Sequence, residues 1–499
     1  MESFLAALAG FSDPYLIGVV IFGTLGGVLV GAMPGLSSTM ATALLLPFTL
    51  TMDPIAAIAL LSALYCAGTF GGSITAILVN APGAPPAAAT AFDGYPLAQK
   101  GYAGKALGMA AVSSVIGGIV SIIVLIVAAP LLSRVAYSFG PPEYFALAVF
   151  GLSMLATISG ESALKNLIGG ALGVLIATIG MDFTTGIERF TFGNWELSEG
   201  ISFIPVMIGL FAGAEFIKQS GKLDLKKVAV PINAVKLPSK QDIRFCLGTI
   251  ARSCGIGSFI GLLPAEGGTV AAMMGYAEAK RFAKDKSEFG KGDLRGIAGP
   301  EAANNAATGA AMVPTLALGI PGSATTAIIL GALMVHGLRP GPHLFTEQPT
   351  LLYSIFLAML IANIAFAVFG FFGAKFFARI TLIPTTYLWP AVFVLACIGA
   401  YALEQAMLDM WIMIIAGFLG FIMQRFGFSA APIIMGLILG ELVEGTLKQS
   451  LIIFDHSWMG FLERPIVVTF LVLTLASMSL PVIAQLRARR RRLADAAGS

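Results

Sequence analysis

The sequence predicts an all-α protein that crosses a membrane many times, built as two inverted repeats with one further transmembrane helix at the C-terminal end. It is 57% hydrophobic and 11% charged with a mean hydropathy of +0.88, and apolar runs of spanning length, about 20 residues, follow one another along the chain. A motif at residues 31–41 recurs at residues 261–271, with Gly, Pro, Thr and Ala in register. Loop charges differ between the two copies, which predicts opposite orientations.

The first copy opens with apolar runs at residues 15–33 and 36–50. Three glycines stand four residues apart in the first run, a spacing that lets helices approach closely in lipid: Gly23, Gly27 and Gly31. Pro34 follows, and a proline in apolar sequence frees backbone groups that hydrocarbon cannot satisfy. Because the second arm is short for a span, we expect a re-entrant hairpin; two ordinary helices joined by a tight turn are the alternative.

The next crossing is interrupted. Residues 65–90 are too long for one straight span and contain the sequence Pro-Gly-Ala-Pro-Pro at residues 82–86. This pattern predicts a discontinuous helix whose unwound centre lies at the bilayer midplane. Four apolar segments complete the first copy: 104–132, 142–159, 163–181 and 198–217.

Positive charge divides the chain. Residues 218–244 hold six lysines and one arginine against two aspartates, so we expect this stretch and the basic tail at residues 487–492 to be cytoplasmic. The predicted organisation is therefore a first membrane repeat, a basic cytoplasmic linker, a second membrane repeat, and a final helix with a basic tail: 1–220, 221–244, 245–447 and 448–499. It places the N-terminus in the periplasm and the C-terminus in the cytoplasm.

The second copy repeats the first. Apolar runs at 245–263 and 266–281 flank a tip that reads Pro264-Ala265-Glu266, and a second interruption follows at residues 319–323. Three positions of the second interrupted segment match the first, with Thr308, Pro321 and Gly322 standing for Thr69, Pro82 and Gly83. The remaining segments are 350–378, 386–402, 405–424, 430–446 and a lone helix at 464–485.

Loop charges test the inversion. The loop after the first hairpin carries only Asp53, whereas its counterpart at residues 280–295 holds six basic residues among three acids. The loop from Met181 to Gly200 is acidic, and its counterpart at residues 424–429 has only Arg425. These loop pairs differ in the sense expected of inverted repeats.

Several function classes are disfavoured. The four cysteines show no CxxC spacing, the three histidines form no HExxH, and no Walker A pattern occurs, so we expect no structural metal, no disulfide and no ATP hydrolysis. A basic tail after an apolar helix is better explained as a membrane anchor than as a nucleic-acid site. A membrane-embedded enzyme lacks support, since neither a DDxxD-like cluster nor a His/Ser/Asp constellation is found. We expect no enzyme and no cofactor apart from a possible Na+ or H+ as coupling ion.

The motifs resemble a known family. Residues 33–39, 68–75, 80–83, 92–97 and 319–323, read in that order, are similar to the large membrane subunit (TctA type) of the tripartite tricarboxylate transporters. The resemblance implies a bacterial inner-membrane permease that works with a small membrane subunit (TctB type) and a periplasmic solute-binding protein (TctC type). It also implies carboxylate substrates such as citrate, driven by a Na+ or proton gradient. The second hairpin tip departs from the first, so the two tips need not share a task.

A carboxylate at mid-membrane needs hydrogen-bond donors, and the N-termini of half-helices supply backbone N–H groups. The candidate substrate-binding residues lie at the tips and breaks: Pro34, Gly35, Ser37, Ser38, Thr39, Asn80, Pro82, Gly83, Gly267, Gly268, Thr269, Pro321, Gly322, Ser323 and Thr325. In the alternative interpretation, the small hydroxyl residues only cap half-helices or pack them.

A coupling cation would be held by carbonyl and side-chain oxygens at the same breaks. The candidate ion-coupling residues are Thr69, Glu266, Glu301, Asn304, Asn305 and Thr308. The adjacent amides Asn304 and Asn305 are alternatively an interhelical clamp, and Glu301 is alternatively an interfacial charge at a helix N-terminus. Asp93 is expected in a cytoplasmic loop or a gate. The function expected from these features is alternating-access secondary transport, with a gated organic-anion channel as the alternative.

Overall fold

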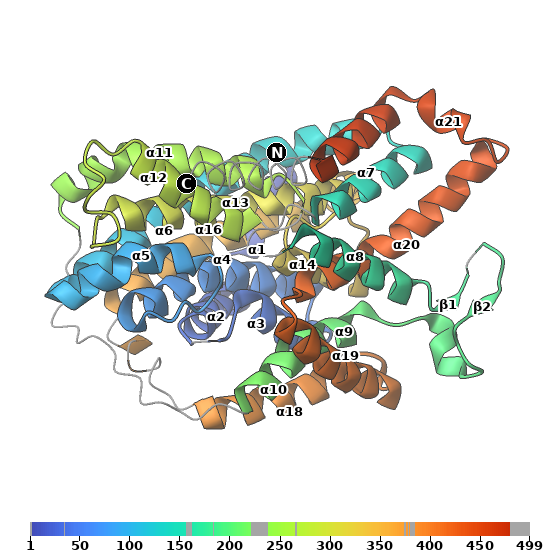
Figure 1. Cartoon of the computed structure of the whole chain (residues 1–499), viewed down its shortest axis with the longest axis horizontal. Coiled ribbons are helices and arrows are strands. Elements are labelled where there is room, and N and C mark those ends of the chain that lie inside the picture. The colour runs from blue at the N-terminus through green and yellow to red at the C-terminus, as the bar shows by residue number, and fades with distance from the viewer. Residues whose placement is uncertain are drawn as a thin grey trace, which may run out of the picture. The chain divides into compact units, whose positions relative to one another are not determined.

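The computed structural model is almost entirely helical (Figure 1), apart from one short two-stranded sheet among the residues that it describes. Seven helices within the described residues are long and apolar enough to cross a membrane. The predicted all-α polytopic membrane protein is therefore confirmed. The structure describes the chain except for Met1, Pro34, residues 156–161, Phe183, residues 221–237, 265–266 and 374–375, Ala378, and residues 380–384 and 480–499.

The chain forms two compact units, and each is described by itself. Unit 1 comprises Met1–Tyr137 and Met207–Phe421, and unit 2 comprises Ser138–Val206 and Ile422–Ser499. Each unit takes segments from both halves of the sequence. The repeat boundaries inferred from the sequence stay a prediction, and most of the basic linker and the basic tail lie outside the described residues.

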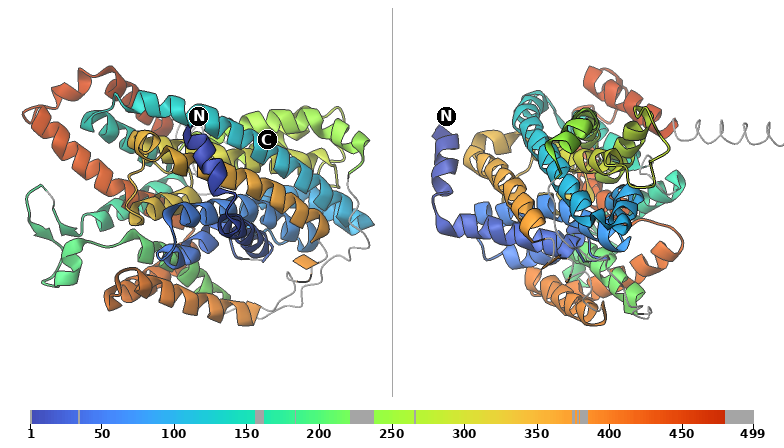
Figure 2. Two further views of the ribbon diagram at one scale, coloured as in Figure 1. Left: turned by 180° about the vertical axis from the view of Figure 1, so that it is seen from behind. Right: turned by 90° about the vertical axis from the view of Figure 1, so that its left-hand side faces the viewer.

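Unit 1 begins with the elements of the first predicted copy. These are α1 (Glu2–Gly10), α2 (Pro14–Gly31), α3 (Ser38–Leu45), the 3-10 helix η1 (Leu46–Thr49), α4 (Pro54–Val79), α5 (Ala87–Leu97), the π-helical turn η2 (Ala98–Tyr102) and α6 (Ala103–Ala136). Helix α1 packs on α16 (Pro349–Phe372) (Figure 2). The ring centroids of Phe4 and Tyr353 are 5.7 Å apart in this contact.

The rest of unit 1 belongs to later parts of the sequence. Its elements are the π-helical turn η5 (Gly209–Gly213), α10 (Ala214–Ser220), α11 (Lys240–Gly261), α12 (Gly267–Arg281), α13 (Arg295–Leu318), α14 (Ala324–Val335), α15 (Pro342–Glu347), α16 and α18 (Thr385–Glu404). Two helices cross the boundary between the units in sequence: α9 (Phe203–Ile208) and α19 (Met407–Arg425).

Unit 2 is smaller. It contains α7 (Pro141–Met154), α8 (Ala163–Ala177), β1 (Gly180–Met181), β2 (Glu188–Arg189), the 3-10 helix η4 (Trp195–Glu199), α20 (Ala430–Ile453), α21 (Met459–Leu462) and a final helical stretch at Pro465–Ser479. Strands β1 and β2 pair antiparallel, with Gly180 opposite Arg189. Helices α8 and α20 pack closely because Gly173 faces the backbone of α20, and a methyl group there would lie 2.0 Å from the carbonyl oxygen of Ile433.

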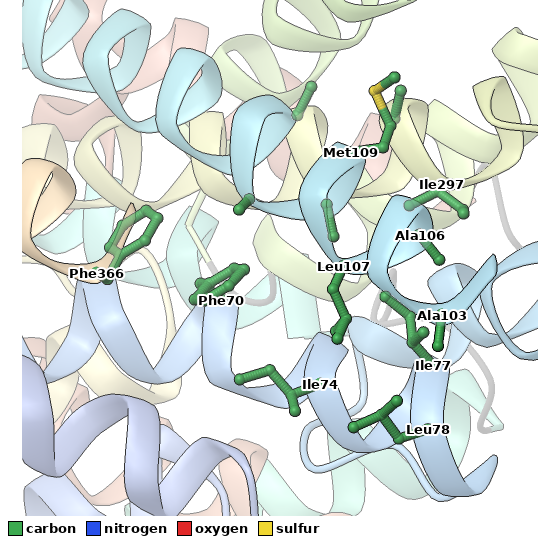
Figure 3. Packing of buried hydrophobic residues seen from close by; sticks show 14 of the residues in the cluster. Phe70, Ile74, Ile77, Leu78, Ala103, Ala106, Leu107, Met109, Ile297 and Phe366 are labelled. Atoms are coloured by element: carbon green, nitrogen blue, oxygen red, sulfur yellow. The ribbon is translucent and has the colours of Figure 1, made fainter. Parts of the chain in front are cut away.

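Helices α4 and α13 form the centre of unit 1. Every residue of α4 from Ala56 to Leu78 is buried, and so is every residue of α13 from Gly296 to Leu318. Phe70 of α4 stacks on Phe366 of α16 with ring centroids 5.1 Å apart (Figure 3). Alanine, glycine and asparagine dominate α13, so its hydropathy is too low for it to be counted among the seven spans although it is fully buried.

The two copies pack their central helices in the same way. Methyl groups added to Gly27 and Gly31 of α2 would each lie 2.6 Å from a carbonyl oxygen of α4, those of Leu64 and Gly68. Their counterparts in α11, Gly257 and Gly261, abut α13 in the same manner, 2.1 and 2.7 Å from the carbonyl oxygens of Ala303 and Ala307. The glycines spaced four residues apart therefore set the close approach of hairpin and broken helix in both copies.

Both predicted interruptions are present. Helix α4 ends at Asn80 and α13 ends at Gly319, and both end residues have left-handed backbone, with φ of 52° and 70°. Glycine and asparagine are the residues that adopt this conformation most readily, which explains why each helix stops there. The helices resume as α5 at Ala87 and as α14 at Ala324.

Candidate functional site

The first hairpin rests on the first break. Helix α2 ends at Gly31, and Ser37 caps α3 by accepting a hydrogen bond from the backbone N–H of Met40. Gly83 of the break lies directly against the hairpin, because a methyl group on Gly83 would lie 2.0 Å from the Gly31 carbonyl oxygen. Ser38 packs on Gly68 of α4, one residue before Thr69. Pro34 of the tip lies outside the described residues.

The second hairpin makes contact with elements of both copies. A methyl group on Gly268, in the first turn of α12, would lie 2.9 Å from the Asn304 side-chain oxygen and 3.4 Å from Pro86 of the first break. Gly267 lies beside Gly261 and Ala307. Thr269 is half-buried in the same turn, and Glu266 lies outside the described residues.

The N-termini of α3 and α14 meet. Their threonine hydroxyls, Thr39 Oγ1 and Thr325 Oγ1, are 2.7 Å apart. Ser323 caps α14 by accepting from the backbone N–H of Thr326, as Ser37 caps α3. Two helix N-termini, each with its partial positive charge, thus converge on one point of unit 1.

These contacts cross between the copies. The first hairpin meets the second break through Thr39 and Thr325, and the second hairpin meets the first break through Gly268 and Pro86. In the register of the repeats, Pro86 is the counterpart of Thr325, and Gly268 is the counterpart of Ser38, next to Thr39. The structure therefore brings the tips and breaks of both copies into one region, as the duplicated motifs suggest.

Glu301 lies inside this region. It is in the second turn of α13 and is 1% exposed. Its two carboxylate oxygens accept hydrogen bonds from Thr90 of α5 and from Ser114 of α6, the latter at 2.8 Å. No basic side chain among the described residues pairs with it. Glu301 is thus buried between three helices.

Asp93 of α5, Lys105 of α6 and Arg295 of α13 each have polar partners. Asp93 of α5 is fully buried and accepts from the backbone N–H groups of Gly290, Gly292 and Asp293 and from the Tyr276 hydroxyl. It therefore lies in a helix and fastens the loop before α13, whereas the sequence suggested a loop or a gate. Two ion pairs hold the basic residues of α6 and α13: Lys105 with Asp242 and Arg295 with Asp293.

The amides and threonines proposed for a cation are buried in α4 and α13. Asn305 donates from Nδ2 to the carbonyl oxygen of Glu301 at 2.9 Å, and Thr308 donates to the carbonyl oxygen of Asn305. Thr69 donates to the carbonyl oxygen of Tyr65 in the same way. The hydroxyl donors of Thr69 and Thr308 are thus used within their own helices, while their oxygens keep lone pairs that can accept or ligate.

Some candidates lie at the margin. Asn80 is exposed and forms the left-handed C-terminal cap of α4 described above. Pro82 is half-buried, and Pro321 and Gly322 are buried in the second break, where a methyl group on Gly322 would lie 2.6 Å from the Ala311 carbonyl oxygen. Gly35 of the first tip lies against Trp389 of α18 and Gln219 of α10.

Sequence reasoning missed several residues of the region. Thr90, Ser114, Pro86 and Trp389 were not singled out, although each contacts a predicted site residue. Thr90 and Ser114 are polar residues in apolar helices, and this pattern is the signal in the sequence that could have indicated them as candidate site residues. Nothing in the sequence pairs them with Glu301, which lies 211 and 187 residues away.

Comparison with known proteins confirms the family resemblance that the motifs indicate. The model of the tripartite tricarboxylate transporter TctA family matches residues 17–435. An uncharacterized 52.8 kDa protein in the TAR-I ttuC' 3' region of Agrobacterium vitis is 39% identical over 468 residues, 94% of this chain and 93% of the relative. An uncharacterized protein in the TAR-II ttuC' 3' region of the same organism is 35% identical over 234 residues, 47% of this chain and 97% of the relative. No solved structure matches. With a family match across most of its length, the chain belongs to the tripartite tricarboxylate transporter TctA family.

Proposed function

We propose that this protein is the large permease subunit of a tripartite secondary transporter that imports carboxylates, either citrate-like tricarboxylates or related organic acids. Its partners are a small membrane subunit (TctB type) and a periplasmic solute-binding protein (TctC type) that delivers the substrate. It lies in the bacterial inner membrane with its N-terminus in the periplasm and its C-terminus in the cytoplasm. Transport follows alternating access and is driven by an ion gradient.

The meeting of α3 and α14 at Thr39 and Thr325 is the observation that carries this proposal. Helix N-termini favour anions because their first backbone N–H groups lack intrahelical partners and carry partial positive charge. In the proposed mechanism, a substrate carboxylate separates the two threonine hydroxyls and takes hydrogen bonds from the first turns of both helices. Gly83 and Gly322 let the two breaks pack directly against backbone atoms of α2 and α13.

Glu301 is the proposed carrier of the coupling proton. The ionised carboxylate accepts from both Thr90 and Ser114, whereas the protonated acid must donate one hydrogen bond, so one of these hydroxyls has to turn round. Protonation thereby changes the contacts between α13 and the two first-copy helices α5 and α6. Sodium coupling through Asn304, Asn305, Thr308 and Thr69 is the second arrangement that the same region offers.

Reconstitution tests the proposal. The permease is placed in vesicles with its small membrane subunit, purified binding protein is added outside, and uptake of labelled carboxylates is measured under imposed pH or Na+ gradients. The proposal expects accumulation against a concentration gradient that collapses when the driving gradient is dissipated. Flux that only equilibrates the substrate, faster than carrier turnover and indifferent to both gradients, would instead establish an anion channel.

A further inference from the structure

An exposed aromatic loop projects from unit 2. Residues 180–200, here called the aromatic loop, connect α8 to α9 and contain β1, β2 and η4 (Figure 1). Four of its large apolar side chains are open to solvent: Ile187 at 64%, Phe190 at 56%, Phe192 at 91% and Trp195 at 76%. Large apolar side chains gathered in one exposed loop are uncommon, and such patches mark interaction sites.

The backbone of the loop is strained where the aromatics are. Phe190 and Phe192 have φ of 57° and 50°, in the left-handed region that bulky side chains rarely adopt. Strain of this kind is costly and persists only where the surroundings impose it. Both phenylalanines are exposed to solvent in this unfavourable backbone conformation. Such strain is typical of binding sites.

Ion pairs hold the loop in place. Arg189 binds Glu444 of α20 through both guanidinium NH groups, and Lys448 binds Asp182 at 2.7 Å and Glu444 at 2.6 Å. The Lys448 ammonium, followed by the backbone N–H of Thr184, holds the pKa of Asp182 well below its usual range. The two ends of the loop also close on each other, with Gly180 against Gly200. The aromatic side chains are therefore presented by a fixed scaffold.

The loop is acidic. It carries four acidic residues and one basic residue, and the base is bound to Glu444. Asp182 is bound to Lys448, and Glu188 accepts hydrogen bonds from Thr191 and Ser198. Among the described residues no hydrogen bond or ion pair is seen for the carboxylates of Glu196 and Glu199, which follow Trp195 in the chain. Unpaired carboxylates beside the aromatics oppose insertion into lipid, because burying them without partners is costly.

Two basic segments place the loop on the far side of the membrane. The apolar run 203–220 separates the loop from the basic linker, and the final helix separates the C-terminal end of α20 from the basic tail. Both basic segments are expected in the cytoplasm. The loop is bound to the C-terminal half of α20 through Lys448. Both basic segments therefore indicate that the aromatic loop lies on the side of the membrane opposite the cytoplasm.

We infer that the aromatic loop is the docking surface for a soluble extracytoplasmic protein whose contacting face has an apolar pocket with a basic rim. Phe192 and Trp195 are the anchors, since exposed aromatics on a preorganised element dominate binding energy at protein interfaces. Glu196 and Glu199 match the basic rim and steer association. The inference rests on the proposed function for the identity of the partner, which is the protein that delivers the carboxylate.

A binding assay tests the surface directly. The permease and its small subunit are held in nanodiscs of zwitterionic lipid, and binding of the purified, substrate-loaded solute-binding protein is measured by interferometry. Phe192→Ser with Trp195→Ser should weaken binding at least tenfold. The control Trp458→Ser replaces an exposed tryptophan between α20 and α21 and should leave binding unchanged. Glu196→Lys with Glu199→Lys should weaken binding and remove most of its dependence on salt concentration.

Measurements of substrate uptake and of lipid contact complete the test. In vesicles, the aromatic variant should need at least tenfold more binding protein for half-maximal uptake and then reach the wild-type maximum. An unchanged requirement in a permease that transports normally would overturn the docking surface and leave the proposed function standing. A wild-type permease that neither transports nor binds the protein would overturn both. Quenching of Trp195, kept as the sole tryptophan, by brominated lipids would also overturn the inference, because the loop would then lie in the membrane.

Discussion

Two replacements of Glu301, by glutamine and by alanine, distinguish the contribution of its hydrogen bonds to stability from the role of its charge in coupling. In Glu301→Gln the amide oxygen can accept from one of the two hydroxyls, and the amide nitrogen can donate to the other, since a hydroxyl serves in either role. The variant should therefore fold with a loss of stability within about 1 kcal/mol, the net worth of one hydrogen bond. Glu301→Ala removes the acceptor of both Thr90 and Ser114. At about 1–3 kcal/mol for each unsatisfied buried group, it should lose roughly 2–6 kcal/mol.

Stability and coupling are then measured on the same variants. Cys66, Cys246 and Cys254 are buried, so a thiol-reactive dye reports unfolding as the detergent-solubilised protein is heated. Uptake in vesicles is measured with a pH gradient at equal Na+ and with a Na+ gradient at equal pH. Glu301→Gln should unfold near the wild-type temperature and take up substrate without responding to the pH gradient.

Three results would count against this reasoning. An unchanged response of Glu301→Gln to the pH gradient would show that Glu301 carries no coupling proton. Equal destabilisation of Glu301→Gln and Glu301→Ala would show that the two hydroxyl contacts do not support the fold in the way described. A response to Na+ alone, in wild type and variant, would move coupling to the amide and threonine oxygens.

Three further substitutions probe the same region. Gly83→Ala places a methyl group 2.0 Å from a backbone oxygen of the first hairpin and should lower the free energy of unfolding by about 1–3 kcal/mol through overpacking. The control Gly255→Ala in α11, where a methyl group meets nothing within 4 Å, should be neutral or stabilising in the same dye assay. Equal melting temperatures of the two variants would contradict the close approach. Thr39→Val removes one hydroxyl of the contact between α3 and α14. It should lower apparent substrate affinity by about two- to tenfold, the effect of losing one hydrogen bond of ~0.5–1.5 kcal/mol. An unaltered substrate concentration for half-maximal uptake would place the substrate elsewhere. Asn304→Ala with Asn305→Ala should weaken the cation dependence of uptake more than it weakens folding, and an unchanged dependence on both Na+ and H+ would remove these amides from the coupling site.

Local sequence was enough to locate the hairpins and breaks. Proline and glycine inside apolar runs have few conformations open to them in lipid, so the interruptions fall where the sequence places them, between Val79 and Ala87 and between Leu318 and Ala324. Glycines spaced four residues apart likewise indicated which helix faces approach closely. These features depend on neighbouring residues, and neighbouring residues are what a sequence shows.

Contacts between distant segments could not be predicted in the same way. Glu301 has a polar, alanine-rich neighbourhood that resembles an interface, and only the folded chain shows that Thr90 and Ser114 enclose it. The sequence suggested a loop at Asp93 because this residue follows the first break and has Lys100 and Lys105 nearby. Its burial depends on three backbone N–H groups almost 200 residues away, and no local pattern carries that information.

The exchange of contacts between copies has a consequence for how the region is assembled. Each hairpin contacts the interruption of the opposite copy, so a single copy folded alone would lack these contacts between copies. An ancestral half-length chain could complete the arrangement only by associating with a second molecule of itself. Joining the halves in one polypeptide makes that association permanent and frees the two tips to diverge, as Pro264-Ala265-Glu266 already differs from Pro34-Gly35-Leu36.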